Sequence, residues 1–388
     1  MPNEIFQVDP PHADVELGVA REPFDVVLAL PPGGVTDKTG VIVHACEFGK
    51  TPGSADIADR LLPELAERHD CAVVSPAYFG IMRNSKVDVS GQFIHNLNRI
   101  YNMKFTSESF AAAKSYADVF VMVAQAVAER GVTSVDLRCQ PIIVTGRGEY
   151  QNWGFLPAID CLSALGAALD RFPQADTRRI YALGQYYGGY VASLLGKLAP
   201  GTFAAIVNRS GYSRVETRHV LCGETLESDL EVNYRIEGQK DYSFTMSLCS
   251  NNPWTVFDET SRFYFSDACR AIRSMLAREH FVDTDASFVY FSEDGDADYI
   301  RHMDAQVDIL GGFAEVRHEK MPSYKAKRVE SLGELLAYAR ERYPDCFSRT
   351  DAGTDFSLGS CHSFPCAGKT YTLRYGADPA SHVAVEIN

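Results

Sequence analysis

Positive charge is in short supply in this sequence. Its 388 residues hold 37 Lys and Arg against 51 Asp and Glu, which gives a net charge of −14 and a pI near 5.2. A chain with this excess of carboxylates is a poor partner for a nucleic-acid backbone or an anionic membrane surface, so we expect neither as a partner. The acidity is explained by ordinary solubility and needs no special ligand.

Long apolar runs and paired cysteine patterns are also missing. No stretch of about 18 apolar residues occurs, so no transmembrane helix is predicted. The first residues, MPNEIFQVDPPHADVE, lack a basic segment followed by an apolar core, so we expect no secretory signal. The ten cysteines are scattered, and several, such as Cys46 and Cys71, lie in apolar runs typical of small buried hydrophobes. These features predict a cytoplasmic protein.

The sequence does contain a regular alternation of short apolar runs with longer segments of helical periodicity. Buried strands are predicted at residues 24–30, 40–46, 71–77, 141–146, 179–184, 203–210, 286–292 and 313–319. Helices are predicted at residues 55–69, 109–131, 151–172, 299–312 and 329–343. This alternation predicts the α/β class, with a mostly parallel, doubly wound sheet covered by helices on both faces.

The chain length fits one large α/β domain with insertions, or two smaller domains. We predict a main domain over residues 1–345, in which irregular insertions at about 78–108 and 211–262 form a cap. Residues 346–388 are predicted to be a C-terminal extension with a β-hairpin. Aromatic residues of the second insertion either line a sugar or peptide pocket or pack a small core of the cap, and we prefer the core; they are Tyr234, Tyr242, Phe244, Trp254, Phe257, Phe263, Tyr264 and Phe265.

The segment from Asp176 to Thr217 carries the most information. It reads as a strand, a sharp turn with the sequence GQYYGG, an amphipathic helix and another strand. A strand-to-helix turn with glycines on both sides of a central residue is typical of the nucleophile elbow of α/β-hydrolases. Gly184, Gly188 and Gly189 hold the glycine places, so the sequence predicts the α/β-hydrolase fold. The alternative is an ordinary strand-to-helix turn with glycines for packing.

Tyrosine occupies the central place of this elbow, where the nucleophilic serine is expected. The phenol of Tyr186 has an ordinary pKa of about 10, so roughly one molecule in a thousand is ionised near neutral pH. Its oxygen also lies a full ring beyond the place of a serine oxygen and would overshoot the oxyanion-binding amides. We interpret Tyr186 as a plug rather than a nucleophile.

The other members of a catalytic triad are incomplete in the sequence. The acid is expected after the strand at 286–292, where Asp294 and Asp296 lie; a solvated acidic turn is the alternative. The loop after the strand at 313–319, where the base is expected, contains no histidine. His318 lies within the strand itself and is interpreted as structural, and His362 would have to fold back from the tail.

The oxyanion site is expected at Cys46 and Glu47, after the second main strand, together with Tyr187 after the elbow residue. Glu47 is a poor neighbour for an oxyanion. Cys46 is a possible substitute nucleophile, but it lies off the elbow and lacks an obvious base.

No cofactor and no metal are predicted. The run from Gly49 to Thr51 follows a strand, but the first glycine of a phosphate-binding loop would fall at His44, and Pro52 interrupts the helix. Cys361, His362 and Cys366 could supply zinc ligands, but a fourth ligand is absent. Both possibilities were set aside.

Three segments resemble an uncharacterised bacterial family of α/β-hydrolases, related more distantly to prolyl oligopeptidases and dienelactone hydrolases. They are GEYQNWGFLPAIDCLSAL (148–165), GQYYGGYVASLLGKLAPGTFAAIVNRSGYS (184–213) and CRAIRSMLAREH (269–280). The resemblance covers about residues 20–345. It implies a serine at position 186 and a histidine in the loop that here reads AKRVESLG, and this chain departs from both. It also implies a link with flagellin and surface-glycan modification, whose genes often neighbour those of the family.

Two functions therefore remain open. In the first, the chain is a non-catalytic homologue that binds a small molecule, a glycan or a protein partner in the capped cleft. In the second, it is an active esterase, deacylase or peptidase-like hydrolase that uses a non-standard nucleophile or base. The first is the preferred hypothesis.

Overall fold

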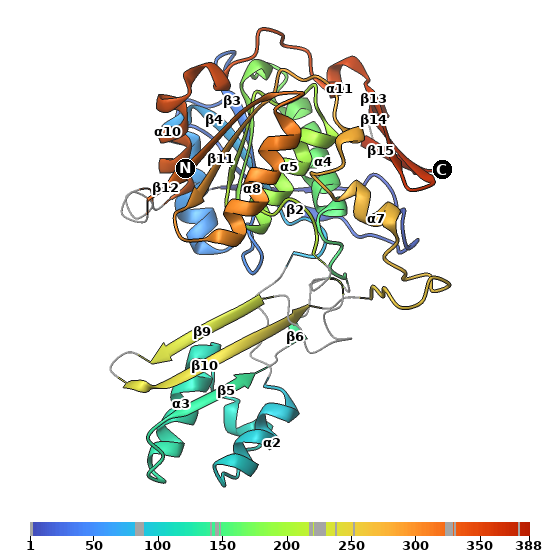
Figure 1. Ribbon diagram of the computed structural model, residues 1–388. Helices are drawn as coiled ribbons and strands as arrows, with labels where there is room; N and C mark the ends of the chain where they lie inside the picture. Colours follow the sequence, from blue (N-terminus) through green and yellow to red (C-terminus); the bar gives the residue numbers. More distant parts are fainter. Residues whose placement is uncertain are drawn as a thin grey trace. The chain divides into compact units, whose positions relative to one another are not determined.

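A computed structural model describes most of the chain (Figure 1). The described residues are 3–81, 89–139, 142–143, 147, 149–216, 220, 230–236, 239–250, 253–322, 329, 331–378 and 381–388. They form two compact units. Unit 1 comprises residues 1–81, 152–215 and 259–388, and unit 2 comprises residues 82–151 and 216–258. Each unit is described by itself.

Unit 1 is built on a sheet of eight strands within the described residues, ordered β1-β2-β4-β3-β7-β8-β11-β12. The strands are β1 (Glu4–Val8), β2 (Phe24–Ala29), β3 (Gly40–Ala45), β4 (Cys71–Pro76), β7 (Ile180–Gln185), β8 (Ala205–Arg209), β11 (Ser287–Glu293) and β12 (Glu315–Met321). β2 pairs antiparallel with both β1 and β4, and the remaining pairs are parallel. Counted in sequence order, this arrangement is 1-2-4-3-5-6-7-8 with an inverted second strand, which is the α/β-hydrolase fold.

Helices cover both faces of this sheet, as the sequence predicts (Figure 1). α4 (Phe155–Arg171) packs against α5 (Tyr187–Leu198). α8 (Ala297–Leu310) lies on the same face of the sheet as α5, because the Tyr290 hydroxyl on β11 is hydrogen-bonded to both Ser193 of α5 and Gln306 of α8. α1 (Leu62–His69), preceded by a π-helical turn η1 (Asp56–Leu61), contacts α10 (Leu332–Arg342). A sheet buried on both faces requires the continuous apolar runs seen in β3 and β4.

Seven of the predicted strands lie in this sheet, and one prediction about it is wrong. The run at 141–146 does not join the sheet of unit 1; its described residues Ile142–Ile143 form β6, which pairs with a strand of unit 2. An apolar run of this length fits either sheet, so its pattern alone does not decide which sheet it joins. β1, which the sequence analysis missed, lies at the sheet edge, where its residues are mostly exposed and carry little apolar signal.

Unit 2 contains more regular structure than the sequence analysis expected. Its described elements are α2 (Gly91–Ile100), a 3₁₀ turn η2 (Ser107–Phe110), α3 (Tyr116–Ala128), β5 (Val135–Cys139), β6, β9 (Leu230–Ile236) and β10 (Gln239–Ser250). β9 and β10 pair antiparallel, and β5 runs parallel to β10. The prediction of irregular insertions was therefore wrong for α2, β9 and β10. The strict alternation of LEVNYRI in β9 was a usable strand signal.

The predicted aromatic cluster is divided between the two units. In unit 2, Phe244 is buried and stacks on Phe120 of α3 with ring centroids 4.4 Å apart, while Phe257 is exposed. In unit 1, Phe265 is buried, and the guanidinium of Arg273 lies 5.4 Å from its ring centroid. The buried members thus pack the cores of separate units.

The C-terminal part of unit 1 adds a second, smaller sheet. It follows α7 (Asp267–Ile272), η5 (Arg278–His280), η6 (Pro344–Phe347) and α11 (Asp355–Leu358). The segments predicted as a hairpin form β14 (Lys369–Asp378) and β15 (Ser381–Ile387), and β13 (Cys361–Cys366) pairs with the other side of β14. α4 contacts β15, so this extension is part of the core of unit 1.

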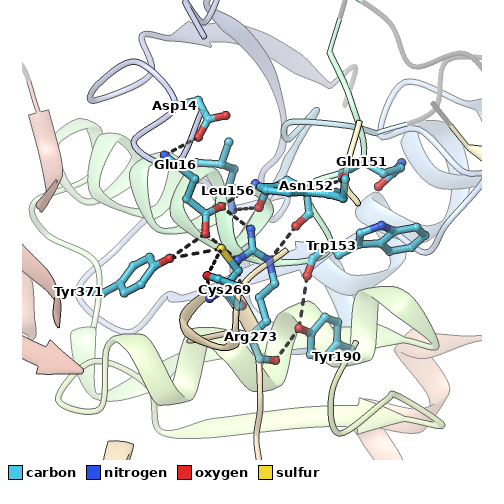
Figure 2. Close-up of polar contacts among 12 residues, drawn as sticks. Asp14, Glu16, Gln151, Asn152, Trp153, Leu156, Tyr190, Cys269, Arg273 and Tyr371 are labelled. Atoms are coloured by element: carbon cyan, nitrogen blue, oxygen red, sulfur yellow. Dashed lines mark hydrogen bonds and ion pairs between the residues drawn. The ribbon is translucent and has the colours of Figure 1, made fainter. Parts of the chain in front are cut away.

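A buried ion pair joins several of these segments (Figure 2). Glu16 accepts from Arg273, from the Tyr371 hydroxyl at 2.9 Å and from the Asn152 amide at 3.1 Å. Arg273 also donates to the backbone carbonyls of Asn152 at 2.8 Å and Cys269 at 3.0 Å. Proximity of the Arg273 guanidinium holds the pKa of Glu16 below its usual value despite burial, so the carboxylate stays ionised. The pair fixes the N-terminal segment against α7 and β14.

Candidate functional site

The turn between β7 and α5 has the backbone of a nucleophile elbow. Tyr186 follows the last residue of β7 and precedes α5, with φ of 50° and ψ of −118°. Its amide donates to the Arg209 carbonyl of the neighbouring strand at 2.8 Å. A side chain other than glycine at positive φ is strained, and such strain persists only where the surrounding structure imposes it.

The three glycines beside Tyr186 are required by close backbone approaches. A Cβ on Gly184 would lie 2.3 Å from the carbonyl of Gly188, and a Cβ on Gly188 would lie 2.2 Å from the carbonyl oxygen of Ala45. A Cβ on Gly189 would meet the Asn208 side chain at 2.2 Å. The need for glycine at these three positions is therefore steric.

The phenol of Tyr186 is held in its protonated form. Burial raises its pKa above the ordinary value, and the nearby carboxylates of Glu293, Glu47 and Asp296 raise it further, while Arg209 acts in the opposite direction. An activated nucleophile requires a lowered pKa instead. This direction agrees with the interpretation of Tyr186 as a plug.

The expected oxyanion segment lies beside the elbow but carries a carboxylate and a buried thiol. Glu47 is half-buried and accepts from the Gln185 amide at 3.0 Å, and burial raises its pKa. Cys46 is fully buried, and burial raises its pKa to about 12, which makes it a poor substitute nucleophile. Tyr187 is also buried; its ring lies 6.0 Å from the rings of both Phe48 and Trp153.

The acidic turn after β11 holds the predicted acid residues. Asp294 has an exposed side chain, and its amide donates to the Met321 carbonyl at 2.8 Å. Asp296 caps the N-terminus of α8. The residue that sequence reasoning missed is Glu293, the last residue of β11, which forms an ion pair with Arg209 at 2.7 Å. Its only sequence signal was its place at the carboxyl end of a strand, which Arg209 shares.

Neither histidine proposed as a base lies free to serve Tyr186. His318 of β12 is hydrogen-bonded to Asp304 at 3.0 Å and to Ser292 at 2.9 Å. Ser292 is fully buried, so this Ser–His–Asp chain is a structural link between β11, β12 and α8. Burial is the main cause that lowers the pKa of His318 and favours the neutral ring.

His362 is bound at the opposite end of α5 from Tyr186. Its Nε2 lies 2.7 Å from Asp355, which also accepts from Gly201 and Thr202 just after α5 ends. The 12 residues of α5 span about 18 Å, so the elbow lies a full helix length away. The usual base-bearing loop, residues 322–331, is described only at 322, 329 and 331, and its sequence contains no histidine. His219 lies outside the described residues.

The set-aside motifs gain no support as ligand sites. Lys50, in the run that resembles a phosphate-binding loop, forms an ion pair with Asp56 at 2.6 Å. Cys366 Sγ lies 3.5 Å from His280 Nε2, and that nitrogen is 2.7 Å from the Pro365 carbonyl. Among the described residues, no group of three or more His, Cys, Asp or Glu side chains could hold a metal ion. No described helix is long and apolar enough to cross a membrane.

Comparison with protein families gives a match over most of the chain. The model of a family described as "protein of unknown function (DUF2920)" matches residues 4–309. The chain belongs to this family. The DUF2920 match covers all of unit 2 and the elbow, and it ends before β12. No curated protein matches the sequence.

Solved structures similar to this DUF2920 protein include two hydrolases. The acylaminoacyl peptidase of Pyrococcus horikoshii is 14% identical with a TM-score of 0.44, over 90% of this chain and 42% of the peptidase. The chain thus spans under half of the length of that enzyme. An S-formylglutathione hydrolase from Agrobacterium tumefaciens is 12% identical with a TM-score of 0.42, over 88% of this chain and 95% of the hydrolase. The strand order described above, rather than these similarities, identifies the fold.

Proposed function

We propose that this DUF2920 protein is a non-hydrolytic member of the α/β-hydrolase fold that binds a ligand around Tyr186. One observation carries the proposal: a protonated phenol occupies the strained elbow position, where hydrolysis requires an activated nucleophile. The elbow backbone is retained and its chemistry is not, which is what a binding homologue derived from a hydrolase would show.

The neighbours of Tyr186 support the same proposal. A serine or phenol needs a base within hydrogen-bonding reach, and His318 and His362 are both held by other carboxylates. Glu47, beside the expected oxyanion position, would oppose the negative charge of a tetrahedral intermediate. The described elbow therefore lacks an activated nucleophile and has a carboxylate beside the expected oxyanion position, and neither His318 nor His362 is placed to act as its base.

The ligand is proposed to be a small molecule, a glycan or a protein partner, and not a nucleic acid or a membrane. The family resemblance supports a place in surface-glycan or flagellin modification. Cys46, Cys71, Cys161, Cys269, Cys346, Cys361 and Cys366 are free, which agrees with a reducing cytoplasm as the proposed location.

The test is hydrolysis of p-nitrophenyl acetate and butyrate by the wild type and by Tyr186→Ser. Tyr343→Ser is the matched control, because it makes the same truncation at a half-buried position at the end of α10, outside the elbow. We expect no turnover above background from the wild type or from either variant, since neither His318 nor His362 is placed to act as a base for position 186. Activity in Tyr186→Ser alone would mean that a base survives and only the nucleophile was lost. Wild-type turnover would overturn the proposal.

A second candidate is an esterase, deacylase or peptidase-like hydrolase with a non-standard nucleophile or base. The retained strain at Tyr186 and the tight glycine contacts favour it, because strain of this kind is often kept for catalysis. Its signature would be wild-type turnover that Tyr186→Phe abolishes, since that variant removes only the phenolic oxygen. Equal turnover in wild type and Tyr186→Phe would exclude the phenol as the nucleophile.

A further inference from the structure

Three tyrosines from separate segments of unit 1 meet at the elbow. Tyr186 lies at the turn, Tyr212 follows β8, and Tyr299 lies in the first turn of α8. The ring centroids of Tyr186 and Tyr299 are 5.4 Å apart at an interplanar angle of 50°, and those of Tyr212 and Tyr299 are 5.5 Å apart at 52°. All three residues are half-buried. We call this group the tyrosine cluster.

The charges near the tyrosine cluster are predominantly negative. Glu293, Glu47 and Asp296 all act on the Tyr186 phenol, against a single guanidinium, that of Arg209. Arg209 and Glu293 form a 2.7 Å ion pair with each other and largely cancel. Glu47, and Asp296 at the N-terminus of α8, add further negative charge at this position.

Glu47 is a half-buried carboxylate whose neighbouring cations are paired with other carboxylates. Its described hydrogen bond comes from the neutral amide of Gln185, and the two cations that act on it, Lys50 and Arg209, form ion pairs with Asp56 and Glu293. A half-buried carboxylate in this setting is stabilised by any cation brought next to it. The faces of aromatic rings attract cations for a related reason, because the ring quadrupole places negative charge there.

The geometry points to an organic ammonium group as the ligand feature recognised at the elbow. We propose that the tyrosine cluster and the carboxylates of Glu47 and Asp296 bind a cationic amine, such as the ammonium group of an amino sugar or a quaternary ammonium compound. Tilted aromatic rings beside carboxylates suit such a group better than a bare metal ion, which needs several closely placed ligating atoms. An anionic ligand would meet repulsion at the same place. This inference rests on the proposed binding function and names the class of its ligand.

The decisive experiment compares ammonium compounds with neutral molecules of the same shape, by calorimetry or by ligand-observed NMR on the full chain. Choline is paired with 3,3-dimethylbutan-1-ol, which replaces the nitrogen by carbon, and glucosamine is paired with glucose. We expect at least one ammonium probe to bind about tenfold more tightly than its neutral counterpart. Equal binding of both members in both pairs, or no binding of either ammonium probe, would overturn the inference.

Variants then locate the binding. Tyr299→Phe keeps the aromatic face and should keep binding of the better ammonium probe, whereas Tyr299→Leu should weaken it about tenfold. Glu47→Gln should weaken it as well, and Glu341→Gln, the same charge change at an exposed position on α10, should not. Circular dichroism checks that each variant is folded. Binding that survives in both Tyr299→Leu and Glu47→Gln would show that the ammonium group sits elsewhere and overturn the assignment.

The two hypotheses fail in different assays. Ester turnover by the wild type would overturn the non-hydrolytic function without bearing on ammonium recognition. Lack of preference for ammonium probes would overturn the ligand class and leave the non-hydrolytic function intact.

Discussion

The strain at the elbow can be measured by replacing Tyr186 with glycine and, separately, with alanine. Both variants remove the same ring contacts with Tyr299, so their difference in stability reports only the backbone at position 186. At an unstrained position, glycine is less stable than alanine by about 0.5–1 kcal/mol, because glycine loses more backbone entropy on folding.

At φ of 50° and ψ of −118° the order should reverse. A non-glycine residue in such a sparsely populated region costs about 1–3 kcal/mol, which glycine avoids. Subtracting the entropic term leaves Tyr186→Gly as stable as Tyr186→Ala or more stable, by roughly 0–2.5 kcal/mol. The strain is imposed by the hydrogen bond from the amide of residue 186 to the Arg209 carbonyl and by the contacts of Gly184 and Gly188, which both variants retain.

Urea unfolding followed by tryptophan fluorescence measures this difference. Trp153 lies in unit 1 and Trp254 in unit 2, so variants with only one of them separate the transitions of the two units. Similar slopes of unfolding free energy against urea in the two elbow variants would show that their denatured states are comparable. If Tyr186→Ala proves more stable than Tyr186→Gly by the ordinary 0.5–1 kcal/mol or so, the backbone is unstrained and the elbow argument is refuted.

Two further predictions concern stability. Burial lowers the pKa of His44 to about 4, below its unfolded value of 6.5. The neutral ring therefore contributes fully to the free energy of unfolding above the unfolded pKa, and this contribution is lost as the pH falls toward 4. At about pH 5 the loss of stability due to His44 should be about 2 kcal/mol. His44→Asn should therefore reduce the slope of unfolding free energy against pH between about pH 7 and 5. An unchanged slope would contradict the lowered pKa of His44. Arg273→Met should destabilise by about 3–5 kcal/mol because it leaves Glu16 buried and unpaired. Adding Glu16→Leu should recover part of that loss in urea unfolding, and a double variant as unstable as the sum of the two single variants would contradict the buried charge as the cause.

The central sheet and the elbow could be predicted because their signals are local. Strands such as β3 and β7 are buried on both faces and therefore read as continuous apolar runs. The elbow glycines are forced by close contacts with neighbouring backbone, so they mark the turn by residue type alone. The sequence did not predict β1 or several elements of unit 2, because an edge strand and a small separate core leave weaker apolar patterns in the sequence.

The candidate site could be predicted only in part. The sequence placed Tyr186 at the elbow and Asp294 in the acidic turn. It gave no sign that Arg209 and Glu293 would pair, since they lie 84 residues apart. Tyr212 and Tyr299 likewise meet only because β8 and β11 are neighbours in the sheet, which brings the segments that follow them to the same edge.

The sequence by itself determined the α/β class, the glycine-flanked turn with tyrosine at its centre, and the absence of a histidine from residues 322–331. These three features follow from residue type and from spacing along neighbouring residues, so they can be read without knowing how the chain folds. The tertiary structure alone decided the direction of the pKa shift at Tyr186 and the setting of Glu47, because both depend on burial and on carboxylates brought from distant segments. It also decided that His318 and His362 are held by Asp304 and Asp355, since hydrogen bonds across elements depend on which elements pack together.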